Sequence, residues 1–275
     1  MRRYLPGLLL VSPALAIIVF LFLVPLAGAV TGAFQDADGG FSFGNFIKTY
    51  QLYSNDILFT IVIVALSALL TAALSVAIAG YLTLGTSPAA VAILRWLYRW
   101  PLFIPFIVVG QILRTFLAKN GLMNNIFVAT GLITPLHTVG FLDWRGIVIA
   151  FVWKQTPFVT LLLAGAMASI DRGTVEAARN LGASRLRILL EIVLPQAAPT
   201  LMVALTLSIV TMMSVLSVPL MIASQSPTVI TVDMAFRINA YGDYGVANAL
   251  GLISLVLTGA VAWIYLRQTM RETAR

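Results

Sequence analysis

The sequence predicts an all-α polytopic membrane protein with six transmembrane helices. Three observations support this fold class: 60% of the 275 residues are apolar, only 10% are charged, and the mean hydropathy is +0.98. Soluble domains carry about 25% charged residues, so this chain has too few charges to cover a water-exposed surface. Its high apolar content excludes a disordered chain, and the absence of cysteine excludes a disulfide-stabilised one.

Long charge-free runs give the expected positions of the helices. A helix needs about 20 apolar residues to cross the hydrocarbon core. Continuous apolar runs favour helices over β-strands, in which lipid-facing residues would alternate with others. In chain order, the predicted spans are about residues 8–30, 57–83, 96–117, 146–170, 200–222 and 247–266.

Basic residues are distributed unevenly between the two sides that six crossings create. Both termini and most arginines fall on one side, whereas most aspartates fall on the other. Because basic loops are retained in the cytoplasm, we expect cytoplasmic N and C termini. The net charge of +7 is then explained by membrane topology, and nucleic acid is not an expected partner.

The fourth predicted span contains an unusual charged residue. Lys154 lies about eight residues inside it, or roughly 12 Å along the helix axis, and is followed by Gln155 and Thr156. Its ammonium group can extend along the helix to the membrane surface, or it can face a water-filled translocation path. Together with Gln111 and Arg114 of the third span, these residues are the candidates for a path lining.

Residues for catalysis, metal binding or ATP binding are missing from the sequence. It has one histidine, His137, no cysteine, and no Gly-x-x-x-x-Gly-Lys-Ser/Thr loop for nucleotide phosphates. Proton-coupled carriers usually keep an acidic residue inside the membrane, and no acid lies near the middle of a predicted span. We therefore expect a transport protein that is not an enzyme, has no cofactor of its own and obtains its energy elsewhere.

The connection between the fourth and fifth spans, residues 171–199, is rich in charged and small residues. Thr174 can cap a short helix over Val175–Asn180. Gly182 can end this helix, because glycine readily adopts the left-handed conformation found after helix C-termini.

A second short helix is expected to follow this turn. Ser184 can cap its beginning, and Pro195 and Pro199 can direct the chain into the fifth span. The segment then consists of two short helices at an angle on the membrane surface. Its small residues leave a flat face for another backbone, and its charges can pair with a partner. The alternative is a connector whose arginines only determine topology.

The motif Glu176-Ala177-Ala178, followed after three residues by Gly182 and after nine more by Ile192-x-Leu194-Pro195, resembles the EAA motif of ABC-importer permeases. Every fixed position is present at the family spacing, and the resemblance extends from about Gly146 to Val256. It implies a type I ABC importer permease fold in which residues 171–199 are the cytoplasmic EAA coupling loop. The residues implied in contact with the ATPase, or in support of that contact, are Glu176, Ala177, Ala178, Arg179, Gly182, Ala183, Arg185, Leu194 and Pro195.

The resemblance also implies the partners. Two ABC ATPase subunits would bind ATP and Mg²⁺, so that this chain itself needs no cofactor. A second permease subunit, homologous or identical, would complete the pathway, and an extracytoplasmic solute-binding protein would deliver the solute. The implied location is the bacterial inner membrane, with the chain as a multi-pass protein in contact with lipid.

The transported solute is less narrowly indicated. The segments Asn180–Ser184 and Ser217–Met221 resemble the branch for polyamines, ferric iron, thiamine and sulfate, whereas sugar permeases commonly have Asp where this chain has Leu181. We expect a small polar or charged solute of the polyamine-like, ferric iron, thiamine, phosphonate or sulfate class. A sugar is the alternative. An ion-coupled secondary transporter and a membrane assembly protein are the two other classes that stay open.

Overall fold

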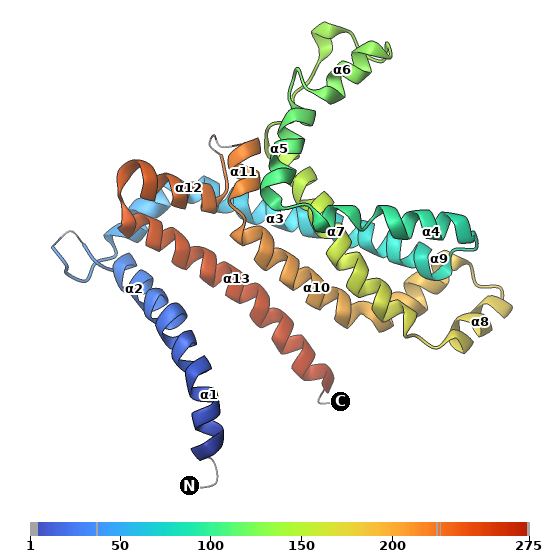
Figure 1. Cartoon of the computed structure of the whole chain (residues 1–275), viewed down its shortest axis with the longest axis horizontal. Helices are drawn as coiled ribbons and strands as arrows, with labels where there is room; N and C mark the ends of the chain where they lie inside the picture. The colour runs from blue at the N-terminus through green and yellow to red at the C-terminus, as the bar shows by residue number, and fades with distance from the viewer. Residues whose placement is uncertain (1–4, 37, 224, 226, 274–275) are drawn as a thin grey trace. The chain divides into compact units, whose positions relative to one another are not determined.

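The computed structural model describes residues 5–36, 38–223, 225 and 227–273, and most of them are helical (Figure 1). Apart from helices, turns and loops, the described residues contain one isolated β-bridge, between Gln35 and Phe41. The predicted all-α class is therefore confirmed. In chain order, the elements are α1 (Leu5–Ile18), η1 (Val19–Leu23), α2 (Val24–Ala33), α3 (Gly44–Leu84), α4 (Pro88–Leu97), η2 (Trp100–Phe103), α5 (Phe106–Leu117), α6 (Leu122–Ala129), η3 (Pro135–His137), α7 (Trp144–Ala168), α8 (Arg172–Asn180), α9 (Arg185–Ile188), η4 (Leu189–Val193), α10 (Leu194–Ser214), α11 (Ser217–Ile222), α12 (Ile230–Phe236), η5 (Arg237–Tyr241) and α13 (Tyr244–Thr273).

Five of the described helices are long and apolar enough to cross a membrane. They are Leu10–Ala33, Gly44–Leu84, Trp144–Ala168, Arg185–Ser214 and Tyr244–Trp263. A sixth crossing is obtained if the segments Pro88–Phe103 and Phe106–Ala129, which meet at an angle of 106°, are taken as one broken span. The described part of the chain thus provides five to six candidate spans.

Two predicted spans fall on two helices each instead of one. Residues 96–117 are divided between α4 and α5, because Pro105 has no N–H for a helical hydrogen bond and stands just before the first residue of α5. Residues 200–222 are divided at Val215, which is extended at φ −79° and ψ 121°. In addition, α3 begins at Gly44 rather than near residue 57.

The chain forms two compact units. The first comprises Met1–Asn55 and Asp233–Leu257, and the second comprises Asp56–Val232 and Thr258–Arg275. In the second unit, a cluster of buried apolar residues joins the end of α3, the end of α7 and the beginning of the helix that contains α10. Its members are Ala79, Leu84, Leu163, Met167, Ile188, Val193 and Ala197.

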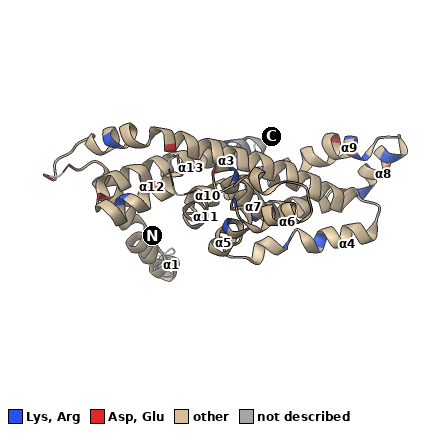
Figure 2. Cartoon of the chain, turned by 90° about the horizontal axis from the view of Figure 1, so that it is seen from above, with Lys and Arg blue, Asp and Glu red and all other residues tan. Residues whose placement is uncertain are grey.

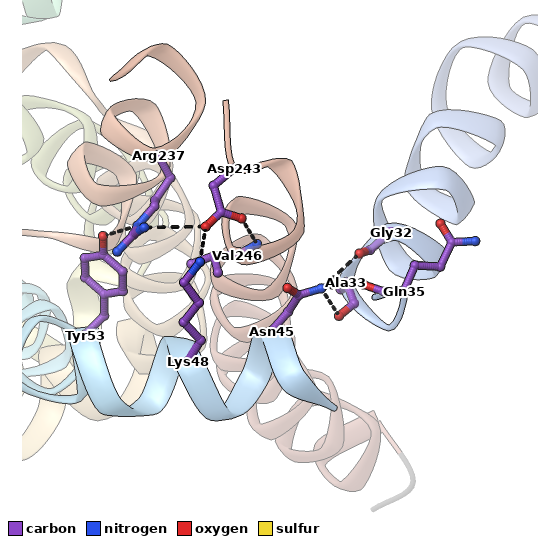
Figure 3. A network of polar contacts seen from close by, with 9 residues as sticks. All are labelled: Gly32, Ala33, Gln35, Asn45, Lys48, Tyr53, Arg237, Asp243 and Val246. Atoms are coloured by element: carbon purple, nitrogen blue, oxygen red, sulfur yellow. Dashed lines mark hydrogen bonds and ion pairs between the residues drawn. The ribbon is translucent and has the colours of Figure 1, made fainter. Parts of the chain in front are cut away.

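A polar network in the first unit links the beginning of α3 to the turn before α13 (Figure 3). Asp243 accepts from Lys48 at 2.6 Å and from Arg237 Nη1 at 3.4 Å, while Arg237 Nε donates to the hydroxyl of Tyr53. Burial raises the pKa of Asp243, but the hydrogen bond from Lys48 and the nearby charges outweigh this effect and hold it below its usual value. This network fixes the turn in which Gly242 is left-handed at φ +62°.

The end of α2 is satisfied by a single side chain, also drawn in Figure 3. The amide of Asn45 donates to the carbonyl oxygens of Ala33, at 3.2 Å, and Gln35, at 2.8 Å. The last carbonyls of a helix have no partner inside it, so Asn45 supplies the missing donor and joins α2 to the beginning of α3.

Two π-helical turns, η1 and η4, each end two residues before a proline. The N–H of Val24 donates to the carbonyl of Val19, and the N–H of Leu194 donates to the carbonyl of Leu189. In both cases a proline follows directly, at Pro25 and at position 195. A proline ring lacks the N–H and crowds the carbonyl four residues earlier. The wider turn lets both helices continue through the proline without a break.

Candidate functional site

The connection between α7 and α10 begins with α8. The predicted helix is present, but it starts at Arg172 instead of Val175. The prediction that Thr174 caps this helix is wrong. Instead the carboxylate of Asp171 accepts from the backbone N–H of Gly173 at 3.2 Å and of Thr174 at 3.1 Å. These two hydrogen bonds hold the pKa of Asp171 below its ordinary value, and its charge favours the helix N-terminus.

The end of α8 has the hydrogen-bond pattern of a Schellman motif. Gly182 is left-handed at φ +84°. The N–H of Ala183 donates to the carbonyl of Ala178, and the N–H of Gly182 donates to that of Arg179, both at 3.0 Å. This pattern satisfies carbonyls that the helix leaves open and confirms the prediction that Gly182 ends the helix. A Cβ at Gly182 would meet nothing within 4 Å, so the position requires a conformation rather than space.

The segment from α8 to α9 has an inner face and an outer face. Val175, Ala178 and Ala183 pack against the buried cluster at the ends of α3 and α7. The other side is exposed, and Leu181 leaves 89% of its surface accessible. Members of the EAA motif region on the exposed side are Glu176, Ala177, Arg179, Gly182 and Arg185. The motif therefore contributes to both faces.

The second predicted helix of the segment does not remain separate. Ser184 caps it as expected, accepting from the N–H of Arg187 at 3.3 Å. The helix then continues through η4 into α10 and forms one 30-residue helix, Arg185–Ser214. Leu194 packs against the buried cluster, whereas Pro195 is exposed and lies inside this helix. The residues that follow the turn at Gly182 are thus the first turns of a helix long enough to be a candidate span.

Lys154 of α7 occupies neither of the two positions that the sequence left open. Its side chain is buried, with 9% exposed. The ammonium group donates to three backbone carbonyls, at 2.7 Å to Pro101, 3.0 Å to Leu102 and 2.6 Å to Ile104. It also lies 5.3 Å from the ring centre of Phe106. Lys154 thus satisfies the carbonyls that are freed where the chain breaks between η2 and α5.

A sequence signal for this break exists in the two prolines four residues apart, Pro101 and Pro105. Each removes a helical N–H, so a continuous helix over both positions lacks two backbone hydrogen bonds. Carbonyls left open inside a membrane need another donor. The signal identifies the break, but it does not identify Lys154 as the donor, because the two segments are about 50 residues apart in sequence.

Gln155 and Thr156 are also largely buried in the second unit, and Thr156 contributes to the wall of an apolar groove of about 470 Å³. The hydroxyl of Thr156 donates to the carbonyl of Val152 at 2.7 Å, and its own carbonyl accepts from Ser75 of α3 at 3.4 Å. Gln155 is buried, and its Nε2 has no hydrogen-bond partner among the described residues. Of these contacts, the hydrogen bond from Ser75 is the one that joins α7 to α3.

The two remaining path candidates lie on α5. Gln111 and Arg114 are both exposed. Arg114 lines a pocket of about 460 Å³ together with Asp143, Trp144 and Gln225. The structure therefore does not bring the five candidate residues to one surface: three are buried on α7 and two are exposed on α5. The sequence interpretation grouped them by polarity, which does not determine the direction in which a side chain points.

These helices define a multi-pass membrane protein with a fixed exposed segment at one end of its second unit. The family of binding-protein-dependent transport system inner membrane components matches residues 75–269. The chain belongs to this family, and the predicted ABC-importer permease class is confirmed. Members of this family are transport components and not enzymes.

Curated relatives carry permease names for different solutes. The chain is 34% identical over 152 residues to the trehalose/maltose permease MalF of Thermococcus litoralis, covering 54% of this chain and 51% of that protein. It is 26% identical to the sulfoquinovosyl glycerol permease SmoG of Agrobacterium fabrum, over 70% and 67% of the two chains. It is also 26% identical to the putative 2-aminoethylphosphonate permease PhnU of Salmonella choleraesuis, over 72% and 73%. The chain thus spans about half of the MalF relative.

Solved structures share the fold. A bacterial ABC transporter involved in the import of the acidic polysaccharide alginate matches 98% of this chain and 96% of its own, with a TM-score of 0.83 and 21% identity. The methionine transporter MetNI matches 82% of this chain and 97% of its own, with a TM-score of 0.61 and 16% identity. At these identities the likeness establishes the fold alone.

Proposed function

We propose that this chain is the permease subunit of an ATP-driven importer in the bacterial inner membrane and that residues 171–199 couple it to the ATPase. The observation that carries the coupling proposal is the construction of α8. This helix is fixed at one end by Asp171 and at the other by Gly182, and its inner face packs on the bundle. Its outer face, with Glu176, Ala177 and Leu181, stays available to a partner.

The coupling segment is suited to transmit movement because it packs directly on the buried cluster and continues into a candidate span. Ala178 and Ala183 bring the backbone close to the buried cluster, and small side chains leave little freedom for sliding. From Arg185 onward the segment is part of a candidate span. A displacement of α8 therefore moves this helix directly, as alternating access between two rigid arrangements requires.

The partners follow from this role. Two ATPase subunits would hold ATP and Mg²⁺, leaving this chain without a cofactor. A second permease subunit, homologous or identical, would form the pathway together with it, and an extracytoplasmic solute-binding protein would deliver the solute. The alginate transporter whose fold this chain shares has been solved with a bound periplasmic protein, which supports this arrangement. In this arrangement we also propose that both the N and the C terminus of the chain lie in the cytoplasm.

The proposed solute is small and polar or charged. The PhnU and SmoG relatives, whose names refer to a phosphonate and a sulfoquinovosyl glycerol, support this class. Exposed Arg114, which lines the pocket that also contains Asp143 and Gln225, offers a cation to such an acidic group. The MalF relative supports a neutral sugar as the second candidate. Of the path candidates, Gln111 and Arg114 are accessible, whereas Lys154, Gln155 and Thr156 are proposed to act only through the position of α7.

The coupling proposal is tested with the substitution Glu176→Lys. The tagged chain is purified from its native host in mild detergent, and co-purifying proteins are identified and quantified by mass spectrometry. We expect an ATPase, a second permease and a solute-binding protein with the unmodified chain, and a loss of about tenfold in ATPase recovery when one charge-assisted contact is reversed.

A matched control is Asp38→Lys, which reverses an exposed carboxylate in the loop between α2 and α3. It should leave the recovery of ATPase unchanged. Equal recovery with Glu176→Lys and Asp38→Lys would show that α8 is only a connector. Solute uptake into proteoliposomes that contain this chain without any ATPase would instead identify an ion-coupled secondary transporter.

A further inference from the structure

Four arginines from two separate parts of the sequence line one cavity of the second unit. Arg95 and Arg99 belong to α4 and the residues after it, and Arg172 and Arg179 belong to α8. Figure 2 shows basic residues on α4, α8 and α9. The cavity measures about 530 Å³, and among the described residues that line it Glu176 is the one acid.

These arginines keep their charge available. Among the described residues, none of the four forms an ion pair. The guanidinium of Arg99 donates to the hydroxyl of Tyr98 at 3.3 Å and lies 5.6 Å from the centre of its ring. With four positive charges against one negative charge among these lining residues, the electrostatic potential in the cavity favours an anion.

An apolar groove adjoins this cavity. It measures about 470 Å³ and is lined by side chains of α3, α4 and α7, among them Leu74, Ile78 and Val152. Tyr98 lines both the groove and the arginine cavity. The two spaces therefore share a wall, with charge on one side of the tyrosine and hydrocarbon on the other.

The helix between the two spaces, α4, and the short η2 turn after it have the composition of a membrane-interface segment. Trp96 and Trp100 leave 60% and 54% of their surfaces exposed, and their rings pack edge to face at 4.6 Å. Tryptophan is enriched at the depth of the lipid headgroups. Exposed apolar residues next to arginine on a short helix fit a location in the plane of that interface. Such a location would place the arginine cavity at the depth of the lipid phosphates.

We propose that the arginine cavity and the apolar groove together form a binding site for one anionic phospholipid. Its phosphate group would lie among Arg95, Arg99 and Arg172, and an acyl chain would lie in the groove along α3 and α7. A free anion would leave the apolar groove empty, and a neutral lipid would leave the four arginines without an anionic partner. The combination of both spaces favours a ligand with an anionic head and a long apolar tail. The bound lipid would touch α8 through Arg172 and Arg179.

The test compares lipids by native mass spectrometry of the whole chain purified in detergent. Dioleoyl phosphatidylglycerol and dioleoyl phosphatidylcholine are added at equal concentration. We expect one preferentially retained phosphatidylglycerol per chain, and a loss of this preference by about tenfold in the double variant Arg95→Gln/Arg99→Gln. These two arginines lie outside the proposed coupling segment, so the result is independent of ATPase docking.

A control double variant is Lys119→Gln/Arg267→Gln, which removes two exposed cations outside the cavity and outside the coupling segment and should retain the preference. The variant Ile78→Trp fills the groove and should reduce the retention of both lipids, and size-exclusion chromatography checks its fold. Equal retention of the two lipids by the unmodified chain, or an unchanged preference in Arg95→Gln/Arg99→Gln, would overturn the proposal. Full competition by glycerol 3-phosphate alone would instead assign the cavity to free anions, and displacement of the lipid by a co-purified protein would assign the groove to that partner.

Discussion

Two regions of the second unit interrupt a helix, and they differ in where the hydrogen-bond partners of the interrupted backbone come from. Between α8 and α9 the chain turns at Gly182, and the turn is closed by groups close in sequence, namely the backbone carbonyls at the end of α8 and the side chain of Ser184, which caps α9. Between η2 and α5 the chain turns at Pro105, and the open carbonyls are satisfied by Lys154, which lies about fifty residues further along the chain. The first turn is local and exposed, and the second depends on a distant buried charge.

Because of this difference, losing a hydrogen-bonding group should cost less stability at the first turn than at the second. Loss of one local cap removes one hydrogen bond at a surface where water replaces it. Loss of a buried donor leaves several carbonyls without any partner, and each buried unsatisfied group is costly. The break before α5 should therefore tolerate substitution much less than the turn at Gly182, and three substitutions measure the contrast.

The largest effect is expected for Lys154→Met, which keeps an unbranched side chain, one atom shorter, but removes its donors. The carbonyls of Leu102 and Ile104 lose their donor, and the carbonyl of Pro101 keeps only the N–H of Ile104 at 3.3 Å, so the free energy of unfolding should fall by about 3 kcal/mol. Tryptophan fluorescence during denaturant unfolding in detergent measures this change. Lys154→Arg should recover part of the loss, and Lys119→Met, at an exposed lysine, should have little effect. If Lys154→Met and Lys119→Met unfolded alike, the three hydrogen bonds would not support the break.

A smaller effect is expected for Gly182→Ala. A side chain at φ +84° costs about 1–2 kcal/mol in the left-handed region. The end of α8 should therefore open more readily, which hydrogen exchange of the amides of Leu181 and Ala183 measures. Gly165→Ala is the matched control, since a Cβ there also meets nothing within 4 Å and its φ is not positive. Equal exchange in both variants would contradict the requirement for a left-handed residue.

The smallest effect is expected for Asp171→Ala, at the beginning of α8. Because the pKa of Asp171 lies below its ordinary value of 3.8, its stabilisation is present above pH 3.8 and is lost as the pH falls through the lower folded-state pKa. In the variant, the amides of Gly173 and Thr174 should exchange faster at neutral pH, and the acid-induced change should disappear. Asp171→Asn should keep the cap and lose only the pH dependence. Unchanged exchange in Asp171→Ala would show that another group caps α8.

The same contrast determines what the sequence can predict. Apolar runs predict candidate spans such as α7 and α13, because membrane crossing depends on length and hydropathy alone. Gly182 and Ser184 are correctly predicted, because a helix end is determined by neighbouring residues. Thr174 is wrongly chosen over Asp171 because both residue types can cap a helix and stand three positions apart.

Features that depend on distant contacts are not predicted. The break at Pro105 has a local cause, yet Lys154 as its donor requires knowledge of how α7 packs against it. For the same reason Gln155 and Thr156 are expected near a path and are found in the core. The beginning of α3 at Gly44 also escapes prediction, since Asn45 and Lys48 are polar and become part of the helix through contacts within the first unit.

The uninterrupted helix Arg185–Ser214 has a geometric consequence. Its 30 residues make a rod about 45 Å long, at 1.5 Å per residue. If such a rod tilts by about 5° around the end near α8, its far end moves by roughly 4 Å, about the width of a water molecule and its hydrogen bond. The π-helical turn at η4 lies close to the pivot, so bending there changes the angle of the whole rod. A small change in the angle at the base of this helix therefore produces a larger displacement at Ser214. The fully buried side chains of Ile188 and Val193 pack near the pivot and limit that change in angle.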